Sequence, residues 1–109
     1  MYPKSKRHPD IPVTHPIEDV REDMLPALKM SKSDFAKALG ISRQTLYDLL
    51  DEKQGITANI ALRLEAVVGG SAEFWLRRQA SHDLWKLRRE LDLSKLKRLR
   101  EPAEADAAE

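Results

Sequence analysis

The stretch SKSDFAKALGISRQTLYDLLDEK, residues 31–53, contains the signals for two short helices joined by a tight corner. Ser31 is placed to cap the first helix, with Asp34 three residues later where a capping acid stands. Gly40 closes that helix, because glycine adopts a positive φ at little energetic cost, and Ser42 caps the second helix. Apolar residues recur at helical spacing on both helices: Phe35, Ala36 and Leu39, then Leu46, Leu49 and Leu50.

This layout is the helix-turn-helix, in which the second helix enters the major groove of DNA. That helix presents five polar side chains outward: Ser42, Arg43, Gln44, Thr45 and Tyr47. Arginine grips guanine with two hydrogen bonds and glutamine grips adenine in the same way, so this helix suits base edges. The same layout also occurs in all-α domains without a DNA role, and this alternative stays open on the motif alone.

Composition excludes several classes of protein. A chain of 109 residues corresponds to one domain, and the absence of cysteine excludes disulfides and thiolate metal sites. No apolar run approaches the ~20 residues of a membrane span and no signal-peptide pattern is present, so we expect a cytoplasmic, nucleoid-associated protein without membrane contact. The three histidines lack metal-type spacing, and no catalytic constellation is visible. The sequence predicts a protein that is not an enzyme and binds neither metal nor cofactor.

The charge is segregated along the chain, although the net charge is only +1. Residues 15–30 carry four acids against two bases, and residues 71–101 carry nine Lys/Arg against five Asp/Glu. The last eight residues add three acids and no base. The run from Lys86 to Arg100 suits nucleic acid or, through its leucines, a second protein, but helices of this kind are usually solvated faces.

Three more helices complete an all-α domain of five helices. The first begins at His15-Pro16 and is predicted to end near Leu25, because Pro26 follows it. The other two are predicted over residues 57–68, capped by Thr57, and from Ser71 onward. Possible breakers of the last helix are Asp92 and Ser94.

Two terminal segments flank the domain, which is predicted to span residues 15–100 with a long C-terminal helix. Residues 1–14 contain three prolines and no apolar period, so they are predicted to form a flexible arm. Residues 101–109 are acidic and rich in alanine, which predicts a disordered tail. Neither segment contains an apolar repeat that covers a core.

Several short motifs between residues 13 and 85 occur together in a characteristic order. They are His15-Pro16, Ser31 through Arg43, Gly55-Ile56-Thr57, Ala61-Leu62-Arg63-Leu64, Ser71-Ala72-Glu73-Phe74-Trp75-Leu76, Gln79 and Asp83-Leu84-Trp85. This combination resembles the HigA-type antitoxins of bacterial toxin–antitoxin pairs, a branch of the lambda-repressor-like (XRE) helix-turn-helix family. The helix-turn-helix core is widely shared, whereas the Glu-Phe-Trp-Leu and Asp-Leu-Trp pair is specific to that branch.

The resemblance implies a lambda-repressor-like fold and a particular function. It implies a homodimer that binds a palindromic operator in double-stranded DNA, represses its own operon and neutralises a cognate toxin. In that family the toxin is typically a HigB-type mRNA-cleaving ribonuclease. Two alternatives remain: a stand-alone transcriptional repressor without a toxin partner, and a helical interaction module that has lost DNA binding.

The resemblance adds two phosphate contacts, Lys32 and Lys53, to the base-reading helix. Related repressors often have Asn-Gly-Lys after that helix, where this chain has Asp51-Glu52-Lys53. The two acids weaken phosphate binding, and Asp48 does the same unless it pairs with a neighbour or accepts from cytosine. The complete predicted DNA-binding set is Lys32, Ser42, Arg43, Gln44, Thr45, Tyr47 and Lys53.

The last helix supplies the predicted dimer interface. Trp75 and Trp85 are ten residues apart and share a broad helical face, which predicts core or dimer packing and not a ligand site. The predicted interface residues are Phe74, Trp75, Leu84 and Trp85.

The acids of the first helix are the predicted toxin contact. Ribonuclease toxins need cationic surfaces to hold phosphate, so a neutralising partner should offer carboxylates. The predicted residues are Glu18, Asp19, Glu22 and Asp23. The alternative is that these acids only favour the helix N-terminus and keep the protein soluble.

Overall fold

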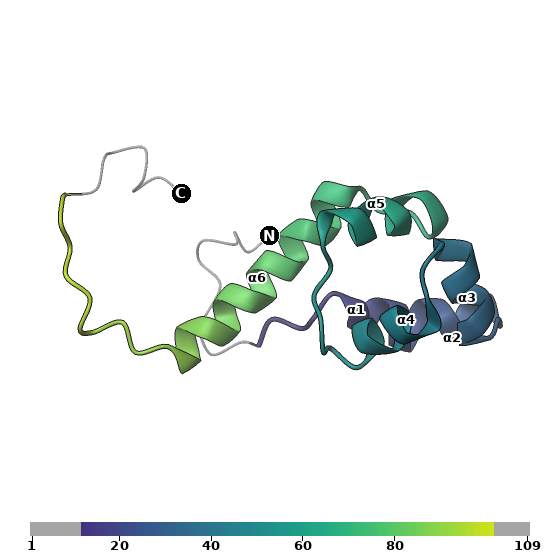
Figure 1. Ribbon diagram of the computed structural model, residues 1–109, viewed down its shortest axis with the longest axis horizontal. Helices are drawn as coiled ribbons and strands as arrows, with labels where there is room; N and C mark the ends of the chain where they lie inside the picture. The colour runs from purple at the N-terminus through teal and green to yellow at the C-terminus, as the bar shows by residue number, and fades with distance from the viewer. Residues whose placement is uncertain (1–11, 102–109) are drawn as a thin grey trace.

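The computed structural model describes residues 12–101, which form an all-α structure without a strand (Figure 1). The helices are α1 (Ile17–Asp19), η2 (Val20–Met24), α2 (Leu25–Leu28), α3 (Lys32–Leu39), α4 (Arg43–Leu50), α5 (Ala58–Val67) and α6 (Ala72–Glu90). The first three follow one another without a break, so the fold has the five helices that were predicted. In Figure 1, α6 runs diagonally, and its C-terminal half extends beyond the other helices.

The first helix continues through Pro26, so its predicted end near Leu25 is wrong. Val20–Met24 form a π-helical turn, and the N–H of Leu25 bonds to the carbonyl of Val20 five residues back. This wider turn shifts the hydrogen-bond register ahead of the proline, which has no N–H and whose ring clashes with an α-helical carbonyl. The proline then lies in the first turn of α2, where a missing N–H is tolerated.

The predicted helix ends around the corner are confirmed. Gly40 has φ 71, and the N–H of Ile41 reaches back to the carbonyl of Ala36 at 3.0 Å. This is the left-handed closure that satisfies the last carbonyls of a helix. At each predicted N-cap, the side-chain oxygen accepts from the N–H three residues later at 3.0–3.3 Å; these residues are Ser31, Ser42, Thr57 and Ser71.

The predicted apolar faces of α3 and α4 lie in the core. Side chains from every helix meet in one buried cluster: Ile17, Val20, Leu25, Phe35, Ala36, Leu39, Leu46, Leu49, Leu50, Ile56, Ile60, Ala61, Leu64, Ala72 and Trp75. Trp75 is only 1% exposed, and its indole N–H donates to the carbonyl of Gly69 at 3.0 Å. Burying so large a side chain with its polar atom satisfied favours the docking of α6 on the domain.

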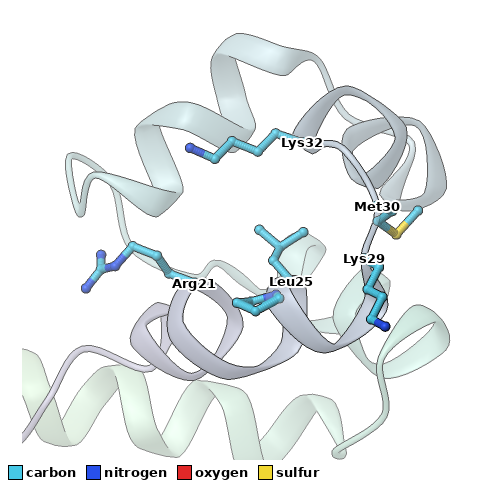
Figure 2. Close-up of a pocket in the computed structure, with 6 residues that line it drawn as sticks. Arg21, Leu25, Lys29, Met30 and Lys32 are labelled. Carbon is cyan, nitrogen blue, oxygen red and sulfur yellow. The ribbon is translucent and has the colours of Figure 1, made fainter.

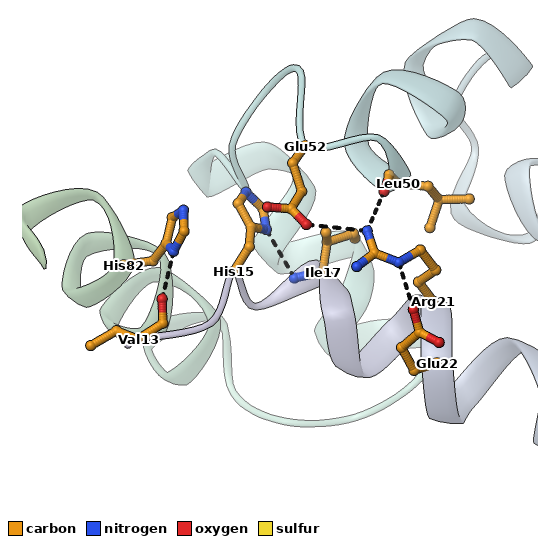
Figure 3. Close-up of polar contacts among 8 residues, drawn as sticks. All are labelled: Val13, His15, Ile17, Arg21, Glu22, Leu50, Glu52 and His82. Atoms are coloured by element: carbon orange, nitrogen blue, oxygen red, sulfur yellow. Dashed lines mark hydrogen bonds and ion pairs between the residues drawn. The ribbon is translucent and has the colours of Figure 1, made fainter. Parts of the chain in front are cut away.

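Two arginines from other helices hold the ends of α3 and α4. Arg63 on α5 donates through Nη1 to the carbonyl of Leu39 at 2.9 Å and of Gly40 at 3.1 Å. Arg21 in η2 donates to the carbonyl of Leu50 at 2.5 Å, at the end of α4 (Figure 3). The last carbonyls of a helix lack intrahelical donors and carry the negative end of its dipole, so a guanidinium there is stabilising.

Buried Gln79 of α6 fixes the loop that follows α4. Its Oε1 accepts from the N–H of Ile56 at 2.8 Å, and its Nε2 donates to Asp83 at 2.9 Å. A Cβ at Gly55 would lie 3.0 Å from the Gln79 side chain, so a larger residue in this loop would require the Gln79 side chain to shift. An ion pair between Asp19 of α1 and Arg78 of α6 joins two further elements that are far apart in the sequence.

Two histidines join the start of the described chain to α6 (Figure 3). Nδ1 of His15 accepts from the N–H of Ile17 at 3.1 Å, and its ring lies 5.0 Å from that of His82. Nδ1 of His82 lies 2.7 Å from the carbonyl oxygen of Val13, so this residue of the predicted arm contacts the domain. Residues 1–11 of the predicted flexible arm lie outside the described residues.

The predicted long C-terminal helix ends at Glu90. Beyond it, residues 91–101 carry no helix and are exposed. Asp92 accepts from both the N–H and the hydroxyl of Ser94, at 3.0 and 2.6 Å. Such a local side-chain bond competes with the helix, as was expected from these two residues. Most of the predicted acidic tail, residues 102–109, lies outside the described range.

We expect Arg63→Ala to lower the free energy of unfolding by about 1–3 kcal/mol, because two helix-end carbonyls lose a charged donor. Urea unfolding followed by circular dichroism measures this. The exposed neighbour Leu62 gives a matched control, and Leu62→Ala should stay within about 0.5 kcal/mol of the parent. Equal losses in the two variants would show that the arginine contacts add nothing.

We expect His15 to make stability depend on pH. Its pKa lies below the usual 6.5, first because of burial; Glu52 and Asp83 oppose the shift, and His82 and Arg21 add to it. The unfolded chain therefore binds the proton more readily, so the neutral ring stabilises the fold above about pH 6.5 and this contribution is lost as pH falls. The stability difference between the parent and His15→Asn should shrink between pH 7.5 and pH 5.5. A difference that stays constant with pH would contradict this.

Candidate nucleic-acid interface

The helix α4 has one buried side and one exposed side. Leu46, Leu49 and Leu50 point into the core. Arg43 and Gln44 in its first turn are exposed, and so is Tyr47 in the next turn. The structure therefore leaves these three predicted DNA contacts accessible on the outer side of one short helix.

Ser42 and Thr45 have hydroxyl groups that bond to each other. The hydroxyl of Ser42 accepts from the N–H of Thr45 at 3.0 Å and donates to its Oγ1 at 2.8 Å. The single proton of Ser42 is therefore committed to fixing the beginning of α4. Thr45 keeps its own hydroxyl proton, which is the donor of this pair that remains for a phosphate or a base.

Asp48, one of the acids expected to repel phosphate, is paired with a neighbouring side chain. The Nε2 of Gln44 donates to its Oδ1 at 2.9 Å, one helical turn away. This bond uses one amide N–H of Gln44 and leaves the other N–H together with the carbonyl oxygen. A bidentate contact with adenine uses this remaining pair. Asp48 therefore positions the amide of Gln44.

A basic groove lies beside α4, between the first helix and the start of α3 (Figure 2). It has a volume of about 380 Å³ and is lined by Arg21, Leu25, Pro26, Lys29, Met30 and Lys32. The side chains of Arg21 and Lys32 extend toward the same side of the groove in Figure 2. Nζ of Lys32 also lies 5.9 Å from the ring centroid of Tyr47, so this predicted phosphate contact adjoins the outer side of α4.

The loop after α4 holds the acids that oppose phosphate binding. Glu52 lies 3.3 Å from Nη1 of Arg21, which offsets its charge (Figure 3). Asp51 is exposed at the end of α4, and Lys53 is exposed two residues later, with its N–H bonded to the carbonyl of Asp48 at 2.8 Å. Because Glu52 and Asp48 are both paired within the chain, these acids are weaker evidence for the alternative that the protein is an interaction module that has lost DNA binding.

The sequence did not reveal that Arg21 and Arg63 hold the helix-turn-helix. Arg21 is one of the two bases counted in residues 15–30, and Arg63 is part of the Ala61-Leu62-Arg63-Leu64 motif. Their carbonyl partners are 29 and 24 residues away in the sequence. No local pattern marks such a contact, since capping from another helix depends on how the helices pack.

The predicted dimer residues do not share one environment. Trp75 belongs to the core of its own chain, so the structure removes it from the predicted interface. Phe74 and Leu84 are 40% and 50% exposed, and Trp85 is half-buried. Leu87, 44% exposed and one turn beyond Leu84, extends the accessible apolar surface of α6.

Two of the four predicted toxin contacts are paired within the chain. Asp19 bonds to Arg78, and Glu22 lies 2.9 Å from Nε of Arg21. Glu18 is half-buried and Asp23 is exposed. The acidic surface that the first helix offers to a partner is therefore smaller than the sequence indicates.

The described part of the chain contains no group of three or more His, Cys, Asp or Glu side chains suited to a metal ion. Within residues 12–101, no helix is long and apolar enough to cross a membrane.

The fold and the exposed side of α4 define a class, the helix-turn-helix proteins. A family model described as Helix-turn-helix matches residues 19–75. The chain is 33% identical over 71 residues to antitoxin HigA-1 of Vibrio cholerae, covering 65% of this chain and 67% of that protein.

Two solved structures are similar to this fold. Antitoxin GraA matches with a TM-score of 0.75 and 30% identity, covering 82% of this chain and 99% of that one. The Pseudomonas aeruginosa antitoxin HigA, solved with the higBA promoter, matches with a TM-score of 0.67 and 27% identity, covering 81% and 99%. The chain belongs to the helix-turn-helix family of DNA-binding regulators, and within that family it is of the HigA antitoxin type.

We expect Arg43→Ala and Lys53→Ala to weaken DNA binding in different ways. If Arg43 contacts a guanine, its loss should cost about 1–3 kcal/mol and relax specificity at that base pair. Loss of the phosphate contact of Lys53 should weaken binding evenly across sequences and lower the salt slope by about one. Fluorescence anisotropy with the promoter fragment and its single-base variants measures both effects. Two variants that bind like the parent would place a different helix in the groove.

Proposed function

We propose that this protein is an autorepressing antitoxin. It forms a homodimer, binds a palindromic operator in its own promoter and neutralises a HigB-type mRNA-cleaving ribonuclease. The observation that carries the proposal is the outer side of α4, where Arg43, Gln44 and Tyr47 are exposed next to Lys32. The similarity to HigA solved with its promoter supports the same use of this surface.

Dimer formation follows from the small size of α4. One short recognition helix contacts too few base pairs to be specific, whereas two related by a two-fold axis match half-sites about one turn, ~34 Å, apart or a multiple of it. The accessible apolar side chains of α6 support an interface there, because Phe74, Leu84 and Leu87 remain exposed on the single chain. This region lies on a different helix from the exposed side of α4.

Toxin binding is assigned to the acids of the first helix. Neither Glu18, which is half-buried, nor Asp23, which is exposed, is paired with another side chain of residues 12–101, and we assign the contact with a cationic partner to these two carboxylates. The helix is held in place by Ile17, Val20 and Leu25 in the core, so little entropy is lost on binding. These acids lie on a different helix from the DNA contacts of α4, so one chain can serve both partners.

A stand-alone repressor is the second candidate function. The pairing of Asp19 with Arg78 and of Glu22 with Arg21 favours it, because half of the acids proposed for the toxin already stabilise this fold. The two functions differ in the neighbouring reading frame. A small basic protein encoded there is required by the antitoxin and not by the repressor.

We expect Glu18→Lys/Asp23→Lys to weaken binding of that small basic protein at least tenfold and to leave promoter binding unchanged. This pair leaves Glu22 and its partner Arg21 intact, so the end of α4 stays held. Glu73→Lys/Glu90→Lys on α6 makes the same change in net charge and should bind the basic protein like the parent. Isothermal titration with the purified basic protein measures the affinities, and sedimentation of the free antitoxin gives the dimer mass.

Two results would contradict the proposal. Unchanged affinity in the first-helix double variant would mean that its acids serve only stability and solubility. A free chain that sediments as a monomer at tens of micromolar would contradict the two-fold dimer.

A further inference from the structure

The stretch that includes the recognition helix has no net charge. Residues 31–53 contain four Lys/Arg and four Asp/Glu, so the side chains that suit base edges bring no surplus of positive charge. Non-specific affinity for DNA comes from cations that displace the counterions of the phosphate backbone. A DNA-binding chain with a neutral recognition stretch therefore needs a surplus of positive charge elsewhere on its surface.

The surplus lies directly after α6. Residues 93–100, LSKLKRLR, contain Lys95, Lys97, Arg98 and Arg100 and no acid; we call them the basic segment. All eight residues are exposed and none is helical. The segment begins just beyond Asp92, whose bonds to Ser94 turn the chain after the helix ends.

The position of the basic segment suits a DNA contact. In Figure 1, the C-terminal end of α6 and the loop between α4 and α5 both lie along the lower edge of the molecule. At ~3.3 Å per residue, eight extended residues span about 26 Å, which is less than one turn of B-DNA, ~34 Å. The segment is therefore long enough to follow the phosphate backbone over most of one turn of DNA.

We propose that the basic segment is a second DNA-binding element, which contacts backbone phosphates independently of base sequence. This inference rests on the DNA binding proposed above. It divides that binding into a sequence-specific part and an electrostatic part. The residues of α4 select the sequence, and Lys95, Lys97 and Arg98 supply electrostatic affinity. The exposed leucines Leu93, Leu96 and Leu99 point to a protein partner as the competing occupant, but four cations without an acid favour a polyanion.

The test is the salt dependence of binding to two 40-base-pair duplexes, the promoter fragment and a random sequence. Lys95→Gln/Lys97→Gln/Arg98→Gln should reduce the slope of log affinity against log salt on both duplexes by about 2.7 for each subunit, which is ~5.4 for the homodimer. The affinity for both duplexes should fall at least tenfold at low salt, and the ratio between them should not change. Arg77→Gln removes an exposed cation of α6 outside the basic segment and should leave the slope within about 0.3 of the parent, roughly one-third of a phosphate contact.

A second variant tests the competing occupant. Leu93→Gln/Leu96→Gln/Leu99→Gln keeps every cation and should bind both duplexes like the parent. An unchanged slope in the charge variant would overturn the inference, as would a loss of dimer mass or of DNA binding in the leucine variant alone. Failure of the proposed function is distinct: the parent would then bind the promoter and the random duplex equally well, whatever the basic segment does.

Discussion

The structure depends on closing the carboxyl ends of the two helices that meet at the corner. Gly40 turns the chain with a positive φ, and the space that a Cβ would fill there is occupied by Arg63, whose Nη1 would lie 2.7 Å from it. Arg21 holds the end of α4 by donating to the carbonyl of Leu50. Both guanidiniums come from helices outside the pair: the first helix holds the end of α4, and α5 holds the end of α3. A short helix of eight residues is marginal alone and needs this support.

The same arginine connects fold and function at the loop after α4. Arg21 contacts Glu22, Glu52 and the end of α4 at once, and it also lines the basic groove next to Lys32. The ion pair with Arg21 limits the repulsion between Glu52 and phosphate. The hydrogen bond from Gln44 to Asp48 pairs that acid and orients the amide of Gln44. Glu52 and Asp48 are therefore partnered within the fold, and Asp48 orients an amide that is predicted to contact DNA.

The separation of charge gives the chain segments of different electrostatic character. The recognition stretch is neutral, the first helix is acidic and the segment after α6 is basic. A neutral recognition helix is selective because it binds through hydrogen-bond geometry and adds little attraction for arbitrary DNA. The net charge of +1 hides this division, because the opposing segments nearly cancel.

Local sequence patterns were enough to predict most helix boundaries, the caps and the buried faces of α3 and α4, since these depend on side chains within one turn of each other. Ser31, Gly40 and Ser42 were found in this way. The continuation of the first helix through Pro26 was missed, because a π turn forms only where packing favours it. Only the tertiary structure decided that Trp75 is core, that Asp19 pairs with Arg78 and that Arg21 and Arg63 hold α4 and α3. These contacts join residues far apart in the chain, and their partners are set by how the helices pack.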